Sequence, residues 1–113
     1  MKLILKSQLN KLAKNNKLSE DGKDTSDLKP VLKLFAPWGG ATWLITEMDE
    51  RRILFGLCDL GVGCPELGYV SLDELEGAKG PFGLKIERDM HFEPNKTLAE
   101  YADEARALGR INA

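Results

Sequence analysis

The stretch Ala41–Asp59, ATWLITEMDERRILFGLCD, decides the fold of this chain. Two runs within it, 42–48 and 53–59, are rich in β-branched, aromatic and aliphatic residues, and the four charged residues 49–52 separate them. Such runs favour strands, and four adjacent charges cannot be buried together. The stretch therefore predicts a β-hairpin.

Side-chain alternation predicts that both faces of this hairpin are largely apolar. Pairing Met48 with Ile53 sorts the side chains into two sets on opposite faces. One set is Trp43, Ile45, Glu47, Leu54, Gly56 and Cys58, and the other is Thr42, Leu44, Thr46, Met48, Ile53, Phe55, Leu57 and Asp59. Because neither set is polar, we expect other elements to cover both faces and the hairpin to lie in the middle of a sheet.

Two residues depart from the apolar pattern of the hairpin. Glu47 stands in a row with Trp43 and Ile45, and a buried carboxylate is costly unless it is paired or hydrogen-bonded. Gly56 lies opposite Ile45, and a glycine inside a strand is typical of a bulge or of a close approach by another group. We expect a bulge at Gly56 and a cation or hydrogen-bond donors beside Glu47.

The remaining segments predict an α+β fold: a small antiparallel sheet of about four to five strands with an N-terminal, a short middle and a C-terminal helix. Helical spacing of apolar residues indicates a helix over 7–17, a polar loop follows at 19–27, and further strands are expected at 31–35, 67–70 and 84–92. Capping boxes begin the other two helices at Ser71 and Thr97, and Gly109 ends the last one.

Length and charge fit one domain with its own core. The 113 residues divide into a helix with a polar loop (about 1–27), a sheet (28–92) and a closing helix (97–109). The formal charge is −2, which gives no overall argument for nucleic acid or an anionic membrane. Residues 1–33 hold eight Lys and four acids, and this local excess is more typical of a solvated surface than of a phosphate-binding one.

The sequence predicts a cytoplasmic protein without a metal, a cofactor or a membrane partner. Cys58, Cys64 and the single histidine, His91, have neither the spacing nor the ligand number of a structural zinc site. No apolar run is long enough for a secretory signal or a membrane span. The cysteines are therefore expected to be reduced thiols.

Several separate segments resemble one bacterial family. The segments KLFAPWGGATWLITEMD, FGLCDLG, PELGYVSLDEL and GLKIERDMHF, in this order, are similar to the family of domain of unknown function 2958. The resemblance implies carriage on plasmids and integrative elements, beside genes for conjugation and antirestriction, and it implies no established activity. The charged turn at 49–52 and Cys64 depart from the family pattern. The matching positions are Trp43, Glu47, Phe55, Gly56, Glu66, Leu67, Gly68, Glu87, Arg88 and Asp89.

The candidate binding residues are polar groups on different predicted strands. Arg88 shares a strand face with Ile86, Met90 and Phe92, so its guanidinium needs water or a carboxylate, for which Glu47 and Glu66 are candidates. If the last strand packs beside the hairpin, these groups would converge in one patch. The full set is Glu47, Glu66, Arg88 and Asp89, with Trp43 and His91 nearby and Trp38 on the 36–40 turn.

Each of these features also has a purely structural interpretation. The charged patch is typical of an ion-pair network that fixes strand register, which we favour over a binding site. Trp38 would stack on a base or a peptide, or fold over the sheet edge. A general base with His91 as acid would describe a small enzyme, but no nucleophile is placed beside them, and Cys58 would need an activating base.

Three hypotheses about function follow. The favoured one is a non-catalytic binding or regulatory accessory protein of a bacterial mobile element, which recognises a protein partner through a sheet edge or the Trp38 turn. The second is a nucleic-acid-binding accessory that uses the lysine-rich segment, with Trp38 and Trp43 as stacking platforms. The third is an enzyme that uses the Glu, Arg and His cluster.

Overall fold

The structure, a computed structural model, describes residues 2–113 and has the α+β fold that the sequence predicts. Within these residues there are three α-helices, two short 3-10 turns and five strands. In chain order the elements are α1 (Lys6–Glu20), η1 (Thr25–Asp27), β1 (Leu32–Phe35), β2 (Thr42–Met48), β3 (Ile53–Asp59), β4 (Glu66–Ser71), α2 (Leu72–Gly77), η2 (Pro81–Gly83), β5 (Glu87–Arg88) and α3 (Leu98–Leu108).

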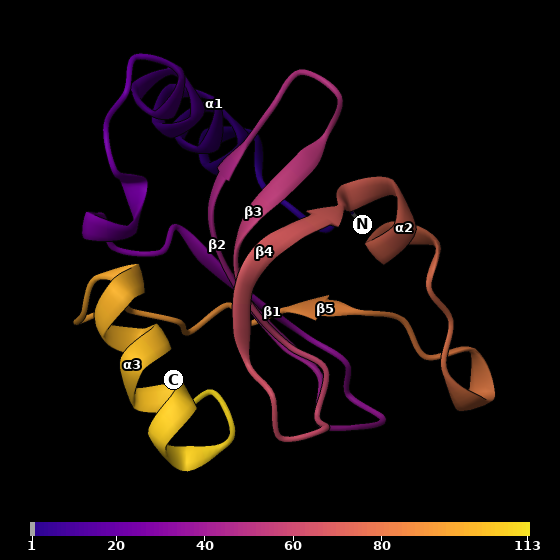
Figure 1. Ribbon diagram of the computed structural model, residues 1–113. Coiled ribbons are helices and arrows are strands. Elements are labelled where there is room, and N and C mark those ends of the chain that lie inside the picture. Colours follow the sequence, from indigo (N-terminus) through magenta and orange to yellow (C-terminus); the bar gives the residue numbers. More distant parts are fainter. Residues whose placement is uncertain (1) are drawn as a thin grey trace.

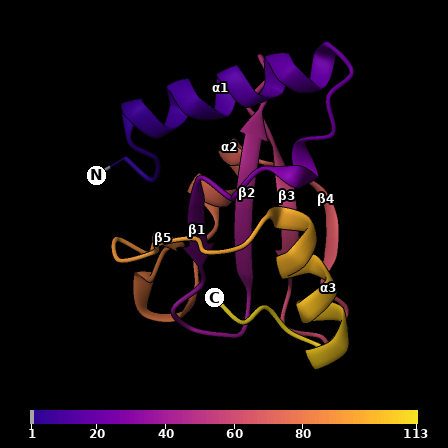
Figure 2. The ribbon, with the colours of Figure 1, turned by 90° about the vertical axis from the view of Figure 1, so that its left-hand side faces the viewer.

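The five strands form one antiparallel sheet in the order β4-β3-β2-β1-β5. The predicted hairpin is β2–β3, and it has a neighbouring strand on each side, so its central position is confirmed. Figure 2 shows β2 between β1 and β3, with α1 crossing the end of these strands. β4 and β5 are the two edges of the sheet.

Other elements cover both faces of the hairpin, as its two apolar faces predict. In Figure 1, α2 and α3 lie on opposite sides of the sheet. The larger buried cluster joins Leu12 of α1 and Leu72 of α2 with strand residues such as Trp43 and Ile45. The smaller cluster packs α3 against β2 and β3. Burying apolar side chains on both faces is the main stabilisation of such a sheet.

The register of the hairpin differs from the prediction at one end. Trp43 pairs with Cys58 and Ile45 with Gly56, as expected, but the register then shifts between Ile45 and Glu47. The bulge is therefore in β2, opposite Gly56. A Cβ at Gly56 would lie 1.9 Å from the carbonyl oxygen of Leu44, so the backbone of β2 approaches too closely for any side chain there.

The bulge moves Glu47 to the opposite face of the sheet. Glu47 pairs with Phe55 and Met48 with Leu54, in place of the predicted pairs Glu47–Leu54 and Met48–Ile53. The prediction that Glu47 shares a row with Trp43 and Ile45 is therefore wrong, because one extra residue in a strand reverses the direction of every side chain after it.

The ends of the helices follow local sequence. Thr97 and Glu100 form the predicted capping box of α3, and Gly109 ends this helix with a φ of 78°. At α2 the hydroxyl of Ser71 accepts a hydrogen bond from the backbone N–H of Glu74. The helix α1 continues to Glu20, beyond the predicted end, and Asn16 donates a side-chain hydrogen bond to Glu20 in its last turn.

The last strand is much shorter than the predicted 84–92. Only Glu87 and Arg88 pair with β1, because the chain turns at the next residue. The Asp89 carboxylate accepts a hydrogen bond from the backbone N–H of His91, and the carbonyl of Asp89 accepts one from Phe92. Such a side-chain bond competes with the ladder of a sheet and favours a turn.

No helix within residues 2–113 has the length and apolar character that a membrane crossing requires.

Candidate functional site

The β2 bulge is held in place by a buried side chain of α1. Thr46, in the shifted step, has no partner residue in β3. Its carbonyl oxygen instead accepts a hydrogen bond of 2.8 Å from Nδ2 of Asn15, which is itself buried. A buried carbonyl without a partner is costly, so this bond stabilises the irregular register. Asn15 thereby sets the face on which Glu47 lies.

Glu47 is a buried carboxylate that lacks a partner. Its side chain is only 5% exposed, and its Oε2 atom has no hydrogen-bond donor. No ion pair to Glu47 forms among residues 2–113, within the salt-bridge distance of 4.0 Å. A buried polar atom in this state is uncommon in folded proteins and is a reason to look for a ligand.

Glu47 lines an open groove of about 500 Å³. One wall is the C-terminal end of α1, with Asn16 and Glu20. The hairpin turn, with Asp49 and Arg51, also lines the groove, and the wall opposite α1 is formed by residues of β3 and β4. Three elements that are distant in the sequence therefore meet around one carboxylate.

The other acids of the groove already have partners. Glu20 accepts a hydrogen bond from Asn16 within α1. Asp49 accepts bonds from the backbone N–H groups of Arg51 and Ile53, which close the hairpin turn. These two carboxylates serve local structure, and Glu47 does not.

The wall on the β3–β4 side is aromatic. The rings of Phe55 and Tyr69 lie 5.0 Å apart, between centroids, at an angle of 53°. Tyr69 is 73% exposed although it lies in the middle of a strand. An exposed aromatic ring beside a carboxylate provides an apolar surface and a negatively polarised face for a cationic group.

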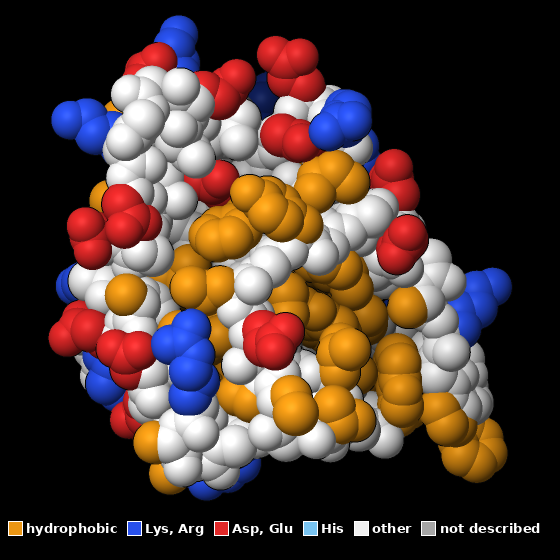
Figure 3. Space-filling model, in the orientation of Figure 1, with side chains coloured by type: hydrophobic (Ala, Val, Ile, Leu, Met, Phe, Trp, Pro, Cys, Tyr) orange, Lys and Arg blue, Asp and Glu red, His pale blue; other side chains and the backbone are white. Residues whose placement is uncertain are grey.

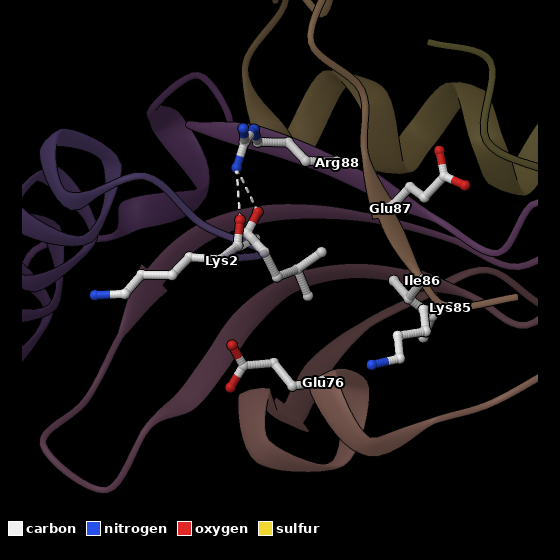
Figure 4. Close-up of a pocket in the computed structure, with 7 residues that line it drawn as sticks. Lys2, Glu76, Lys85, Ile86, Glu87 and Arg88 are labelled. Carbon is white, nitrogen blue, oxygen red and sulfur yellow. Dashed lines mark hydrogen bonds between the residues drawn. The ribbon is translucent and has the colours of Figure 1, made fainter. Parts of the chain in front are cut away.

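Arg88 lies elsewhere and does not pair with Glu47. β1 separates β5 from β2, and Arg88 pairs with Leu34 of β1. Its guanidinium donates hydrogen bonds to the carbonyl oxygens of Leu3, at 2.6 Å, and Lys2, at 3.5 Å (Figure 4). The predicted Glu47–Arg88 contact is therefore wrong, because backbone carbonyls at the start of the chain satisfy the arginine instead.

The cavity in Figure 4 holds both signs of charge. It measures about 290 Å³ and is lined by Glu76, Lys85 and Glu87 in addition to Arg88. The Arg88 side chain points toward the N-terminal segment, and Glu87 points away from it (Figure 4). Arg88 thus ties that segment to β5, which is a structural role.

Asp89 and His91 share a second groove with Arg88, of about 500 Å³, along β5. The Asp89 carboxylate lies 3.5 Å from Nζ of Lys33 and accepts the His91 backbone N–H at 2.9 Å. His91 is exposed. The charged residues of this groove are exposed or have partners, so it lacks the unsatisfied buried group that marks the Glu47 groove.

The remaining candidate residues are also scattered. Glu66 is exposed at the start of β4, where it pairs with Cys58. Trp43 is buried in the larger core cluster. Trp38 is 37% exposed, and its indole packs against Gly80, where a Cβ would lie 2.2 Å from the ring. The expectation that these polar groups converge in one patch is therefore wrong.

The groups nearest to the hairpin offer no activated nucleophile. Burial raises the pKa of the Cys58 thiol from an ordinary 9.0 to about 11, so it carries a proton at neutral pH and is a poor nucleophile. In the part of the chain that the structure describes, no three His, Cys, Asp or Glu side chains are arranged to hold a metal ion.

Sequence reasoning missed Asn15 and Tyr69. Asn15 lies three residues after Leu12 on the buried side of α1, and a polar residue in an apolar stripe is a signal for a buried hydrogen bond. Tyr69 lies opposite Phe55 once β4 is paired with β3, and it would have been found by extending the alternation to the next strand.

Comparison with known proteins gives a family and no activity. Searches of curated proteins and of solved structures gave no match. The family model described as "Protein of unknown function (DUF2958)" matches residues 3–112, which include every element of the fold from α1 to α3. The chain therefore belongs to the DUF2958 family.

Proposed function

We propose that this protein is a non-catalytic binding module that takes an extended segment of a partner protein along the free edge of β4. The observation that carries the proposal is the edge itself. β4 is six residues long, ends the sheet on one side, and exposes Tyr69. A free strand edge presents unpaired N–H and C=O groups that form hydrogen bonds with an added strand.

The composition of β4 supports this use of the edge. Proteins commonly protect edges with lysine, proline or very short strands. The other edge, β5, has only two residues, whereas β4 reads ELGYVS, with no lysine or proline. Hydrophobic side chains gather over the front of the molecule, where β4 runs, as Figure 3 shows. The β4 edge is therefore long enough to pair with another strand and carries no lysine or proline that would prevent pairing.

We further propose that the protein acts in the cytoplasm as an accessory or regulatory protein of a bacterial mobile element. The resemblance to the family suggests this context. The nucleic-acid alternative is weaker, because Trp43, one of its two stacking platforms, is 5% exposed and lies in the core.

Site-specific photo-crosslinking tests the proposal. The photoreactive residue p-benzoylphenylalanine replaces Tyr69, which keeps an aromatic group on β4, and the protein is irradiated in the cells that carry its gene. The control position is Leu108, which is 51% exposed at the last residue of α3 and lies outside β4. We expect a discrete crosslinked polypeptide from position 69 and none from position 108.

Two results would contradict this function. Equal yields at both positions, or no crosslinked protein at position 69, would exclude a specific partner at the β4 edge. Tight DNA binding that weakens steeply with salt would favour the nucleic-acid alternative, because release of counterions governs that dependence.

A further inference from the structure

We infer that the Glu47 groove receives the guanidinium of an arginine side chain from the partner segment that lies along β4. The inference rests on the proposed function, because it names the chemistry that the partner presents. Tyr69 connects the two features: it belongs to the free edge, and its ring lines the groove. A segment paired with β4 is therefore placed to extend a side chain into the groove.

Burying the unpaired carboxylate of Glu47 costs the folded chain free energy. The carboxylate is buried, its Oε2 has no donor, and the described residues supply no cation within 4.0 Å. A buried charge without a partner destabilises a fold, and an apolar residue of similar size would remove that cost. No described residue pairs with this charge, whereas a bound cation would pair with it.

The electrostatic field in the groove attracts cations. Its charged lining residues are the acids Glu20, Glu47 and Asp49 and one base, Arg51. The groove also lies at the C-terminal end of α1, which carries the negative end of the helix dipole. A cation entering the groove is stabilised by both contributions, and an anion is repelled by both.

The groove suits an arginine side chain better than a lysine side chain. A guanidinium is planar, is less strongly hydrated than an ammonium group, and stacks on aromatic rings. The groove has a ring surface of Phe55 and Tyr69 beside the carboxylate, which suits a planar cation that also pairs with Glu47. An ammonium group would lose more hydration and would not use the aromatic wall as fully.

Arg51 is the internal competitor for this position. It lines the groove, its side chain is exposed, and it forms no ion pair within residues 2–113. Its charge lowers the attraction for an external cation without neutralising Glu47. Removing it in Arg51→Ala is therefore expected to strengthen binding two- to fivefold.

The test is an NMR titration of the whole protein with N-acetyl-arginine methylamide. The neutral isostere, N-acetyl-citrulline methylamide, and the lysine analogue are the comparison probes. We expect the arginine probe to shift the amide signals of Phe55 and Tyr69 in a saturable way. The lysine analogue should bind at least threefold more weakly, and the citrulline analogue should produce no saturable shift.

A matched pair of variants isolates the carboxylate. Glu47→Gln and Glu50→Gln remove the same charge from the same hairpin, but Glu50 is exposed and lies outside the groove. We expect Glu47→Gln to weaken arginine binding at least tenfold and Glu50→Gln to weaken it less than twofold. The amide spectrum of each variant without probe verifies that the fold is retained.

The inference is overturned if the citrulline analogue binds as well as arginine, if lysine binds equally or more tightly, or if the two variants weaken binding equally. Absence of a saturable shift in the unaltered protein would also overturn it. These failures are distinct from failure of the proposed function. A protein crosslinked at position 69 with no arginine binding would leave the β4 edge in place and remove only the groove as a site.

Discussion

Two buried carboxylates lie near opposite ends of the central hairpin, and they differ in whether the chain supplies hydrogen-bond donors to them. Asp59, at the end of β3, is 2% exposed, and Glu47, near the end of β2, is 5% exposed. The Asp59 oxygens accept hydrogen bonds from the backbone N–H groups of Gly61, at 2.8 Å, and Ile111, at 3.0 Å. The Oε2 atom of Glu47 accepts none.

The difference teaches that burial alone does not identify a binding residue. Asp59 ties the loop after β3 and the segment after α3 to the sheet, so its charge has a structural purpose. Glu47 is nearly as buried but lines a groove that remains open. The distinction between an anchor and a site rests on whether the chain itself supplies the partners.

The largest expected effect on the free energy of unfolding is at Asp59. Asp59→Ala removes both acceptors and leaves the backbone N–H groups of Gly61 and Ile111 without this buried partner, so it should lower the free energy of unfolding by about 3 kcal/mol. Urea denaturation measures this change. Asp59→Asn keeps one acceptor oxygen and should cost less. A loss below about 0.5 kcal/mol for the alanine variant would show that Asp59 is not an anchor.

The next effect concerns the residue that places Glu47. Asn15→Ala removes the donor to the Thr46 carbonyl and should lower the free energy of unfolding by about 2 kcal/mol. Asn16→Ala is the matched control, because Asn16 bonds only to Glu20 on the surface of the same helix. Equal losses in the two variants would mean that the β2 bulge does not depend on Asn15.

A smaller effect, of opposite sign, is expected at Glu47. Glu47→Leu removes an unpaired buried charge and should raise the free energy of unfolding by about 1 to 2 kcal/mol. The same urea denaturation experiment measures it. If this substitution destabilised the protein as Asp59→Ala does, Glu47 would be a structural anchor and the comparison between the two acids would fail.

The last prediction concerns the reactivity of Cys58, which precedes Asp59, and leaves stability at neutral pH unchanged. Because its folded pKa is raised to about 11, the thiol contributes stability below its ordinary pKa of 9.0, and this contribution is lost as pH rises toward 11. At pH 8 the native Cys64→Ser variant should react with iodoacetamide about 100-fold more slowly than an ordinary thiol. Rapid alkylation of this variant would show that Cys58 is accessible and ionised.

The elements that depend on neighbouring residues were predictable. The strands of the hairpin have the predicted bounds, because strong strand formers flank a charged turn. Thr97 and Glu100 cap α3 because each bonds to a backbone group three residues away. Hydrophobic alternation also predicted two buried faces, since it needs no knowledge of what covers them.

The candidate site was predicted only in part, because its geometry depends on distant residues. Glu47 was singled out correctly as an unusual buried acid, but the bulge that turns it toward β3–β4 is held by Asn15, 31 positions before Thr46. Arg88 was expected to find a carboxylate, whereas it found the Leu3 carbonyl, 85 positions away. Periodicity contains no information about contacts at such separations.

The sequence by itself determined the hairpin, the helix ends and the presence of an acid in an apolar ribbon, because short-range hydrogen bonds and side-chain alternation govern these features. Only the tertiary structure decided which acid is satisfied. The partners of Asp59 and the bond that turns Glu47 come from elements far apart in the chain, and folding alone brings Ile111 to one carboxylate and leaves the other facing an open groove.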